Sequence, residues 1–364
     1  MQKILLLLFL FFPILTFAQT DEIQKDAFFK AEVIQIVEQQ KTIFPDGTET
    51  EQQNLLLRGL EGDFEDKKIN FNGIGEIDVL NKNIYKSGDR VLMVASHDAE
   101  GSVAYYITDY VRTKSLWGLA IVFVLVLFSV GGIKGLRSLL ALALTFLVII
   151  KYIVPQILSG ASPLLITLIG SLIILFVIIY TTEGFRARSH LAAISIFISL
   201  IITILFSLVF VSLTKLTGAA SEDILFLFNI GGQVINFQGL LLAGVIIGAL
   251  GVLDDVVISQ IGTVEQIAEA NESLGRIEIF KHAYKVGVSH IASMTNTLFL
   301  AYAGVSLPLL ILFVSGESAF LSFNQIINNE IIATEVVRTL VGSIGLILSV
   351  PIATFIAVWW YGKK

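Results

Sequence analysis

The stretch FQGLLLAGVIIGALGVLDDVVISQI, residues 237–261, is apolar almost throughout but contains two adjacent carboxylates, Asp254 and Asp255. It is long enough to cross a lipid bilayer as one helix. Small and polar residues recur in it every three or four positions, so a helix places them along one face. These residues are Gly244, Gly248, Gly251, Asp255 and Ser259. The stretch therefore predicts a transmembrane helix with a glycine-lined, polar face that a second helix can approach closely.

The composition extends this interpretation to most of the chain. Of its 364 residues, 55% are hydrophobic and 15% are charged, which is typical of a membrane protein with several spans. The chain has no cysteine, and its four histidines lack the spacing of metal ligands, so we expect neither disulfides nor a metal site. We expect seven spans, at residues 116–133, 138–155, 163–181, 190–213, 239–257, 287–314 and 335–360.

The N-terminal part of the chain differs in character from the rest. Residues 1–18 carry a basic residue, then an apolar run, and end in small residues, so we expect a signal peptide; an uncleaved anchor is the alternative. Residues 19–114 are polar and acidic, with short alternating runs between turn residues, which is typical of a small β domain. The sequence thus predicts an all-α polytopic membrane domain, residues 115–364, preceded by an extracytoplasmic β-barrel-like domain.

Basic residues between the expected spans indicate an orientation. Lysines and arginines lie between the first and second, the third and fourth, and the fifth and sixth spans, and at the C-terminus. All four clusters fall on one side of the membrane, which the positive-inside rule identifies as the cytoplasm. We therefore expect the C-terminus in the cytoplasm and the β domain outside, as a signal peptide requires.

Asp255 is the first candidate for chemistry, because it shares the glycine-lined face of its helix. It lies about 9 Å from the centre of the predicted span by the helical rise. Carboxylates inside a membrane are costly and indicate function by default. Asp254 points about 100° away around the helix axis and is the second candidate. Either can couple transport to a proton or another ion; the alternative is an acid at a helix end that reaches cytoplasmic water.

The sixth expected span carries a cluster of polar residues in its first half, including Ser293, Thr295 and Asn296. Such side chains can coordinate a passing ion, or simply hold packed helices together by hydrogen bonds. The preceding residues 258–286 alternate acidic and apolar side chains, which is typical of an amphipathic helix at the membrane surface. We therefore place the three polar residues along a candidate route for an ion.

The seventh expected span begins with Glu335 and Arg338, which are spaced to pair within a helix. Gly342 and Gly345 continue the same stripe, so we expect them, like the three glycines of the fifth span, at helix contacts. Arg338 and Asp255 lie roughly 20 Å apart along the membrane normal by the helical rise. We interpret these two residues as opposite ends of one polar route.

The sequence lacks motifs that are typical of enzymes and nucleotide-binding proteins. It contains no nucleotide-binding loop, no nucleophile–base signature and no zinc-binding HExxH motif. We therefore expect neither enzymatic activity nor a cofactor, and no nucleic acid partner. The expected partners are membrane lipid and either further copies of the chain or another membrane subunit.

Three longer stretches carry a resemblance to a known family. They are GALGVLDDVVIS at 248–259, HIASMTNTL at 290–298 with LAYAG at 300–304, and NNEIIATEVVR at 328–338. The chain resembles the YibE/F family of bacterial multi-pass membrane proteins, which implies a location in the bacterial cytoplasmic (inner) membrane. The single aspartate usual in that family falls at Asp255. A fainter likeness, in the order and direction of the elements only, is to the proton-driven RND and SecDF-type permeases.

These observations favour a secondary permease of unknown substrate, with proton coupling through Asp255. The alternative is a non-transporting scaffold or regulatory subunit of an envelope complex. A third hypothesis, one half of a hetero-oligomeric transporter, follows from the small-residue stripes, which leave room for a partner.

Overall fold

A computed structural model describes residues 27–43, 49–74, 84–97, 103–220, 224, 235–315 and 322–363. The chain divides into two compact units, Met1–Val126 and Leu127–Lys364. The predicted signal peptide, residues 1–18, lies outside the described residues.

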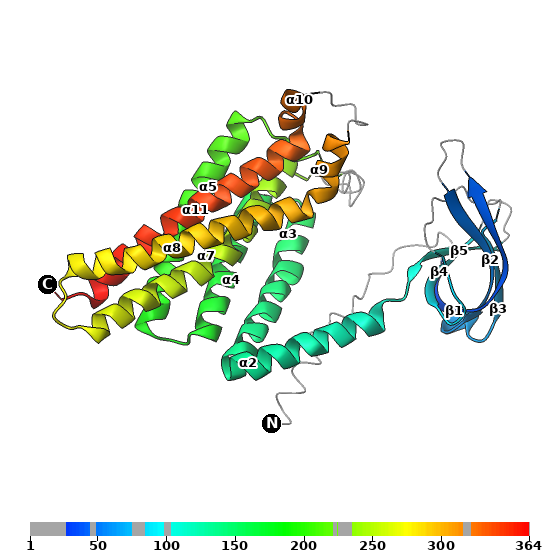
Figure 1. The fold of residues 1–364 in the computed structure, drawn as a ribbon, viewed down its shortest axis with the longest axis horizontal. Coiled ribbons are helices and arrows are strands. Elements are labelled where there is room, and N and C mark those ends of the chain that lie inside the picture. The colour runs from blue at the N-terminus through cyan, green and yellow to red at the C-terminus, as the bar shows by residue number, and fades with distance from the viewer. Residues whose placement is uncertain are drawn as a thin grey trace. The chain divides into compact units, whose positions relative to one another are not determined.

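The N-terminal unit is built on a five-stranded antiparallel sheet with the strand order β3-β2-β1-β4-β5 (Figure 1). Inward-facing residues of β1, such as Phe29, Ala31 and Val33, alternate with more exposed ones, as a half-buried strand requires. Two register shifts bend β1, which pairs with β4 near its start and with β2 further along. The strands are β1 (Ala27–Ile43), β2 (Glu49–Gly59), β3 (Lys68–Asn72), β4 (Arg90–His97) and β5 (Val103–Tyr110), with a 3-10 turn, η1 (Gly62–Phe64), after β2.

The C-terminal unit is helical. Its elements are α2 (Thr113–Val148, which begins in the N-terminal unit), the π-helical η2 (Ile149–Ile153), α3 (Val154–Leu158), α4 (Pro163–Thr182), α5 (Ala187–Leu213), α7 (Phe237–Ala270), α8 (Arg276–Val305), α9 (Leu307–Val314), α10 (Phe323–Ile327) and α11 (Glu330–Tyr361). In the described residues, five helical stretches are long and apolar enough to cross a membrane: Thr113–Leu158, α4, α5, α7 and α11. The chain is therefore a polytopic membrane protein with an N-terminal β unit, as its sequence predicted.

The first two expected spans lie together in the stretch Thr113–Leu158, which has 46 residues. A kink separates them at Gly132, whose φ of 55° and ψ of −138° are not helical. Glycine adopts this left-handed φ without the steric penalty of other residues. The break falls just before the basic turn that the sequence predicted between the two spans.

The sixth expected span, residues 287–314, is not one continuous helix, and it is not among the five described stretches that are long and apolar enough to cross a membrane. It divides at Ser306 into α8 and α9, with a proline at the start of α9, where the missing N–H does no harm. Residues 258–286 do not form one separate helix as expected: α7 continues to Ala270, and α8 begins at Arg276 and packs against α7. A buried amide joins these helices to α11, since Gln260 Nε2 donates to Ala283 O at 2.9 Å and to Thr354 Oγ1 at 2.7 Å.

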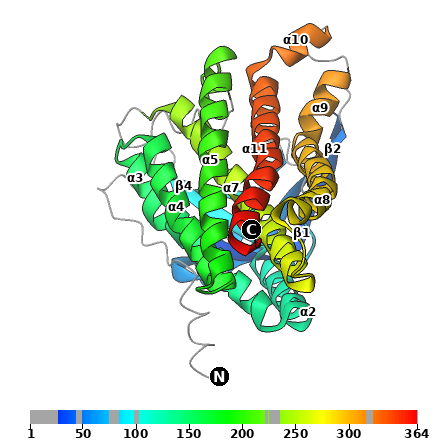
Figure 2. The ribbon, with the colours of Figure 1, turned by 90° about the vertical axis from the view of Figure 1, so that its left-hand side faces the viewer.

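Helix α7 is the central element of the helical unit. It packs against α4, α5, α8 and α11, which Figure 2 shows around it. Its buried side chains, among them Ile246, Leu253 and Val257, belong to the largest apolar core of the unit.

Candidate functional site

The polar stripe predicted on α7 lies on the unburied side of this helix. Gly244, Gly251, Asp255 and Ser259 are exposed, and Gly248 is half-buried. The other faces of α7 are packed against four helices, and most of the stripe stays exposed. The periodicity of the sequence predicted the stripe. Its exposure depends on how the neighbouring helices pack against α7, which the sequence does not show.

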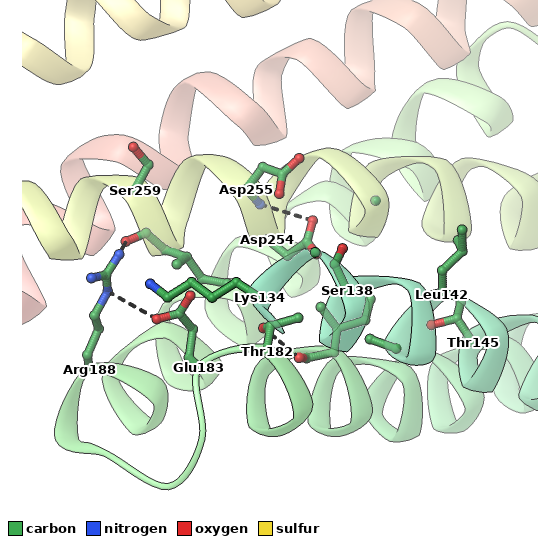
Figure 3. A pocket seen from close by; sticks show the side chains of 15 residues that line it. Lys134, Ser138, Leu142, Thr145, Thr182, Glu183, Arg188, Asp254, Asp255 and Ser259 are labelled. Atoms are coloured by element: carbon green, nitrogen blue, oxygen red, sulfur yellow. Dashed lines mark hydrogen bonds and ion pairs between the residues drawn. The ribbon is translucent and has the colours of Figure 1, made fainter. Parts of the chain in front are cut away.

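The part of this stripe that contains the aspartates lines a pocket of about 710 Å³. Helices α2, α4 and α5 supply the opposite walls, and Figure 3 shows their side chains around Asp254. A cavity of this size accommodates a hydrated ion or a small organic molecule. Its polar lining consists of Lys134, Ser138, Thr145, Thr182, Glu183, Arg188, Asp254, Asp255 and Ser259.

The two aspartates differ in their surroundings. Asp254 is buried, with 7% of its surface exposed, whereas Asp255 is exposed. One oxygen of Asp254, Oδ1, accepts a hydrogen bond from the backbone N–H of Asp255 at 3.0 Å, and in Figure 3 the two carboxylates diverge. Among the described residues, neither carboxylate has a basic partner within ion-pair distance. A buried carboxylate without such a partner needs a proton or a bound cation to offset its charge.

Arg188 closes one end of the pocket and joins α5 to α7. Its Nη2 donates to Ile258 O at 3.0 Å, and its guanidinium lies 4.0 Å from Glu183 and 3.9 Å from Glu265. Gly262 makes room for it, because a Cβ there would lie 2.5 Å from Arg188 Nη2. Sequence reasoning used Arg188 only as a marker of membrane orientation. A local signal was Gly262 itself, a glycine that continues the predicted stripe one turn beyond Ser259.

A second pocket, of about 180 Å³, lies near the N-terminal end of α7. Leu240 and Leu241 of α7 line it together with Glu335 and Arg338 of α11. The predicted pairing of Glu335 with Arg338 is confirmed, with 2.9 Å between the carboxylate and the guanidinium. The structure therefore places this ion pair and the aspartates in separate pockets.

The polar residues expected along the route on α8 lie outside both pockets. Ser293 and Asn296 are exposed and Thr295 is half-buried, and none of the three lines the pocket that contains the aspartates or the pocket of the ion pair. Their part in a route stays a prediction.

The five glycines expected at helix contacts have different surroundings. A Cβ on Gly345 would overlap Thr203 Oγ1, so this glycine allows α5 and α11 to approach closely. A Cβ on Gly248 would lie 3.5 Å from the Tyr302 hydroxyl, an ordinary contact. At Gly244, Gly251 and Gly342, an added Cβ would meet no described atom within 4 Å.

Fold and site together define a polytopic membrane protein with an acidic pocket on its central helix. Residues 119–363 match the family described as YibE/F-like protein. The chain belongs to this family, as its sequence motifs indicated, and the match covers the helical unit but not the β unit. No curated protein and no solved structure matches the chain.

Proposed function

We propose that the protein is a secondary permease in which Asp254 and Asp255 couple transport to the movement of protons. The observation that carries this proposal is a buried carboxylate without a basic partner, lining a polar pocket on the central helix. Ionisable groups in such positions are typical of proton relays in pumps and transporters. The proposal is for a transporter and not for an enzyme, and it leaves the transported substance open.

The arrangement of charges supports a role for the aspartate pair in binding. Asp254 lies where water is restricted, and Asp255 lies beside it on the open side of the pocket. A proton or cation can therefore pass from bulk water to the exposed carboxylate and then to the buried one. In the proposed orientation, the β unit lies outside the cytoplasmic membrane and the pocket of the aspartates is near the cytoplasmic side, since the surrounding basic residues favour that side.

Access of water to the pocket tests this proposal against a scaffold or regulatory subunit. The chain has no cysteine, so Gly251→Cys introduces a single thiol next to the aspartates at a position where a side chain meets no described atom. A water-soluble thiol reagent reacts with the thiolate, which forms in water but not in lipid. We expect the reagent to modify Gly251→Cys in membranes.

The matched control is Leu205→Cys, at an exposed position on α5 in the apolar part of the same unit. We expect no modification there, because this position faces lipid if α5 spans the membrane. An unreactive thiol at both positions contradicts the permease and leaves the scaffold as the better account.

A further inference from the structure

The pocket of the aspartates is long and is charged at one end only. Lys134 and Thr145 of α2 both line it, about 16 Å apart by the helical rise. Figure 3 shows the charged end at Lys134, Glu183 and Arg188, the uncharged end at Thr145, and Asp254 between the two ends. A molecule in the pocket therefore meets a charged environment on one side of Asp254 and an uncharged one on the other.

The charged side chains that line the pocket leave the charge of Asp254 unbalanced. Arg188 is held between Glu183 and Glu265, at 4.0 Å and 3.9 Å. Among the described residues, neither Arg188 nor Lys134 lies within ion-pair distance of Asp254. The charged side chains that line the pocket with Asp254 are Lys134, Glu183, Arg188 and Asp255. Because the carboxylates outnumber the basic groups and the buried one has no partner, the pocket favours a positively charged ligand.

The walls of the pocket favour an organic cation over a metal ion. A metal ion such as Ca²⁺ or Mg²⁺ needs several oxygen ligands around one point. Among the described residues, no group of three or more acidic, histidine or cysteine side chains could hold a metal ion. Aliphatic side chains instead form part of the lining, namely Ala141, Leu142, Ile178 and Ile258. Such side chains stabilise a ligand that carries hydrocarbon together with its charge.

A buried hydroxyl at the uncharged end indicates a polar group on the same ligand. Thr145 Oγ1 is buried and has no hydrogen-bond partner among the described residues. Thr182, in the same pocket, instead donates its hydroxyl to Ile178 O at 2.8 Å. Since an unpaired polar group in a buried position is costly, the free hydroxyl of Thr145 suits a ligand group that bonds to it.

We propose that this pocket binds a small organic cation. Its ammonium group pairs with Asp254, its hydrocarbon part lies between the aliphatic side chains, and its uncharged polar end bonds to the Thr145 hydroxyl. This inference rests on the proposed permease function, because a molecule bound there is a substrate only in a transporter. The carboxylate that carries the proton in that function then holds an ammonium group or a proton in turn, so that one positive charge replaces the other.

Calorimetric titration of the purified full chain in detergent tests the ligand class with two probes. Aminopentanol carries an ammonium group and a hydroxyl at opposite ends of a short hydrocarbon chain, and pentanediol has the same shape without the charge. We expect aminopentanol to bind, and pentanediol to bind about 30-fold more weakly or not at all, because it cannot pair with the carboxylate. Equal affinity for the two probes, or binding of neither, overturns the inference.

A matched pair of carboxylate variants locates the charged end of the probe. Asp254→Asn should weaken the binding of aminopentanol by about 30-fold or more, because the ammonium group loses its partner. Glu269→Gln removes a carboxylate from an exposed position of the same helix outside the pocket, and should leave the affinity unchanged. An affinity that survives in Asp254→Asn, or falls equally in both variants, contradicts the assignment.

A matched pair of hydroxyl variants locates the other end. Thr145→Val keeps the shape of the side chain and removes its hydroxyl, which should weaken binding by about threefold to tenfold through the loss of one hydrogen bond. Thr167 also has a buried hydroxyl without a partner among the described residues, but it does not line the pocket. Thr167→Val should therefore have no effect on binding, and equal affinities in the two valine variants argue against the contact with Thr145.

These outcomes are separate from failure of the proposed function, because binding is measured without a membrane. If the permease proposal is wrong, aminopentanol binds at Asp254, but the protein in liposomes moves neither aminopentanol nor protons. If only the ligand class is wrong, proton flux depends on the aspartates, and aminopentanol does not bind or binds equally well to Asp254→Asn.

Discussion

At the scale of single residues, the two adjacent aspartates of α7 have different surroundings, since Asp254 is buried and Asp255 is exposed. Helical periodicity correctly placed Asp255 on the same face as the glycines. It could not predict that this face stays open while Asp254 is enclosed, because burial depends on how α2, α4 and α5 pack around α7. The structure therefore gives Asp254 more weight than the sequence did.

The stability of the two aspartate variants should reflect this difference. A buried carboxylate without a basic partner destabilises the fold. Residues that are retained for their function often have such a cost in stability. We expect Asp254→Asn to raise the free energy of unfolding by about 1 kcal/mol at neutral pH. Asp255→Asn, at an exposed position, should change it by less than about 0.5 kcal/mol. Thermal unfolding in detergent compares them, and a larger loss of stability in Asp254→Asn contradicts the description of this carboxylate.

At the scale of elements, hydropathy predicted the helices with continuous apolar runs. The expected spans at 163–181 and 190–213 agree with α4 and α5 to within a few residues at either end. Prediction was poorer where a helix continues beyond its apolar run. α7 extends to Ala270, and within this extension the polar side chain of Gln260 is bonded to α8 and α11. Such contacts between distant segments leave no local signal in the sequence.

The kink in α2 gives a prediction with a control on the adjacent residue. Gly132 has a φ of 55°, and a Cβ there would meet no described atom within 4 Å. Gly132→Ala should therefore destabilise the helical unit through its backbone alone, by about 1–3 kcal/mol. Gly131→Ala, also free of nearby atoms, should be neutral or slightly stabilising, because alanine favours a helix. Equal unfolding temperatures for the two variants would show that the backbone conformation of Gly132 does not contribute to the stability of the helical unit.

The contact between α5 and α11 gives a second matched pair. Gly345→Ala places a methyl group against Thr203, whose hydroxyl is already bonded to Ser199 O. Separation of the two helices should cost about 1–3 kcal/mol. Gly342→Ala lies one turn earlier on α11, where a Cβ meets no described atom, and it should leave the unfolding temperature unchanged or slightly higher. A Gly345→Ala protein as stable as Gly342→Ala argues against close packing at this point.

At the scale of the whole molecule, the change in composition near residue 114 predicted a β part followed by a helical part. The sequence could not predict the pocket, because residues far apart in the chain assemble it. Lys134, Thr182, Arg188 and Asp254 come from four different helices and meet only in the folded unit. The family match covers the helical unit and gives no ligand for its pocket.

The two units have separate apolar cores, which predicts independent unfolding. Leu57 is fully buried in the core of the β unit, and residues of the helical unit are not part of that core. Leu57→Ala should destabilise the β unit by about 2–5 kcal/mol and lower only one of two unfolding transitions seen by calorimetry. Gly345→Ala should lower only the other. A single transition that moves with either substitution would mean that the units unfold together.

The most direct test of the proposed function is proton flux through the purified protein in liposomes. A pH-sensitive dye is trapped inside, a pH gradient is imposed, and the native chain is compared with Asp254→Asn combined with Asp255→Asn. Gly342→Ala serves as a control substitution away from the pocket. The account predicts flux in the native and control proteins and its loss in the double variant. Equal flux with and without the two carboxylates, in proteins that are folded alike, would contradict their role in proton coupling.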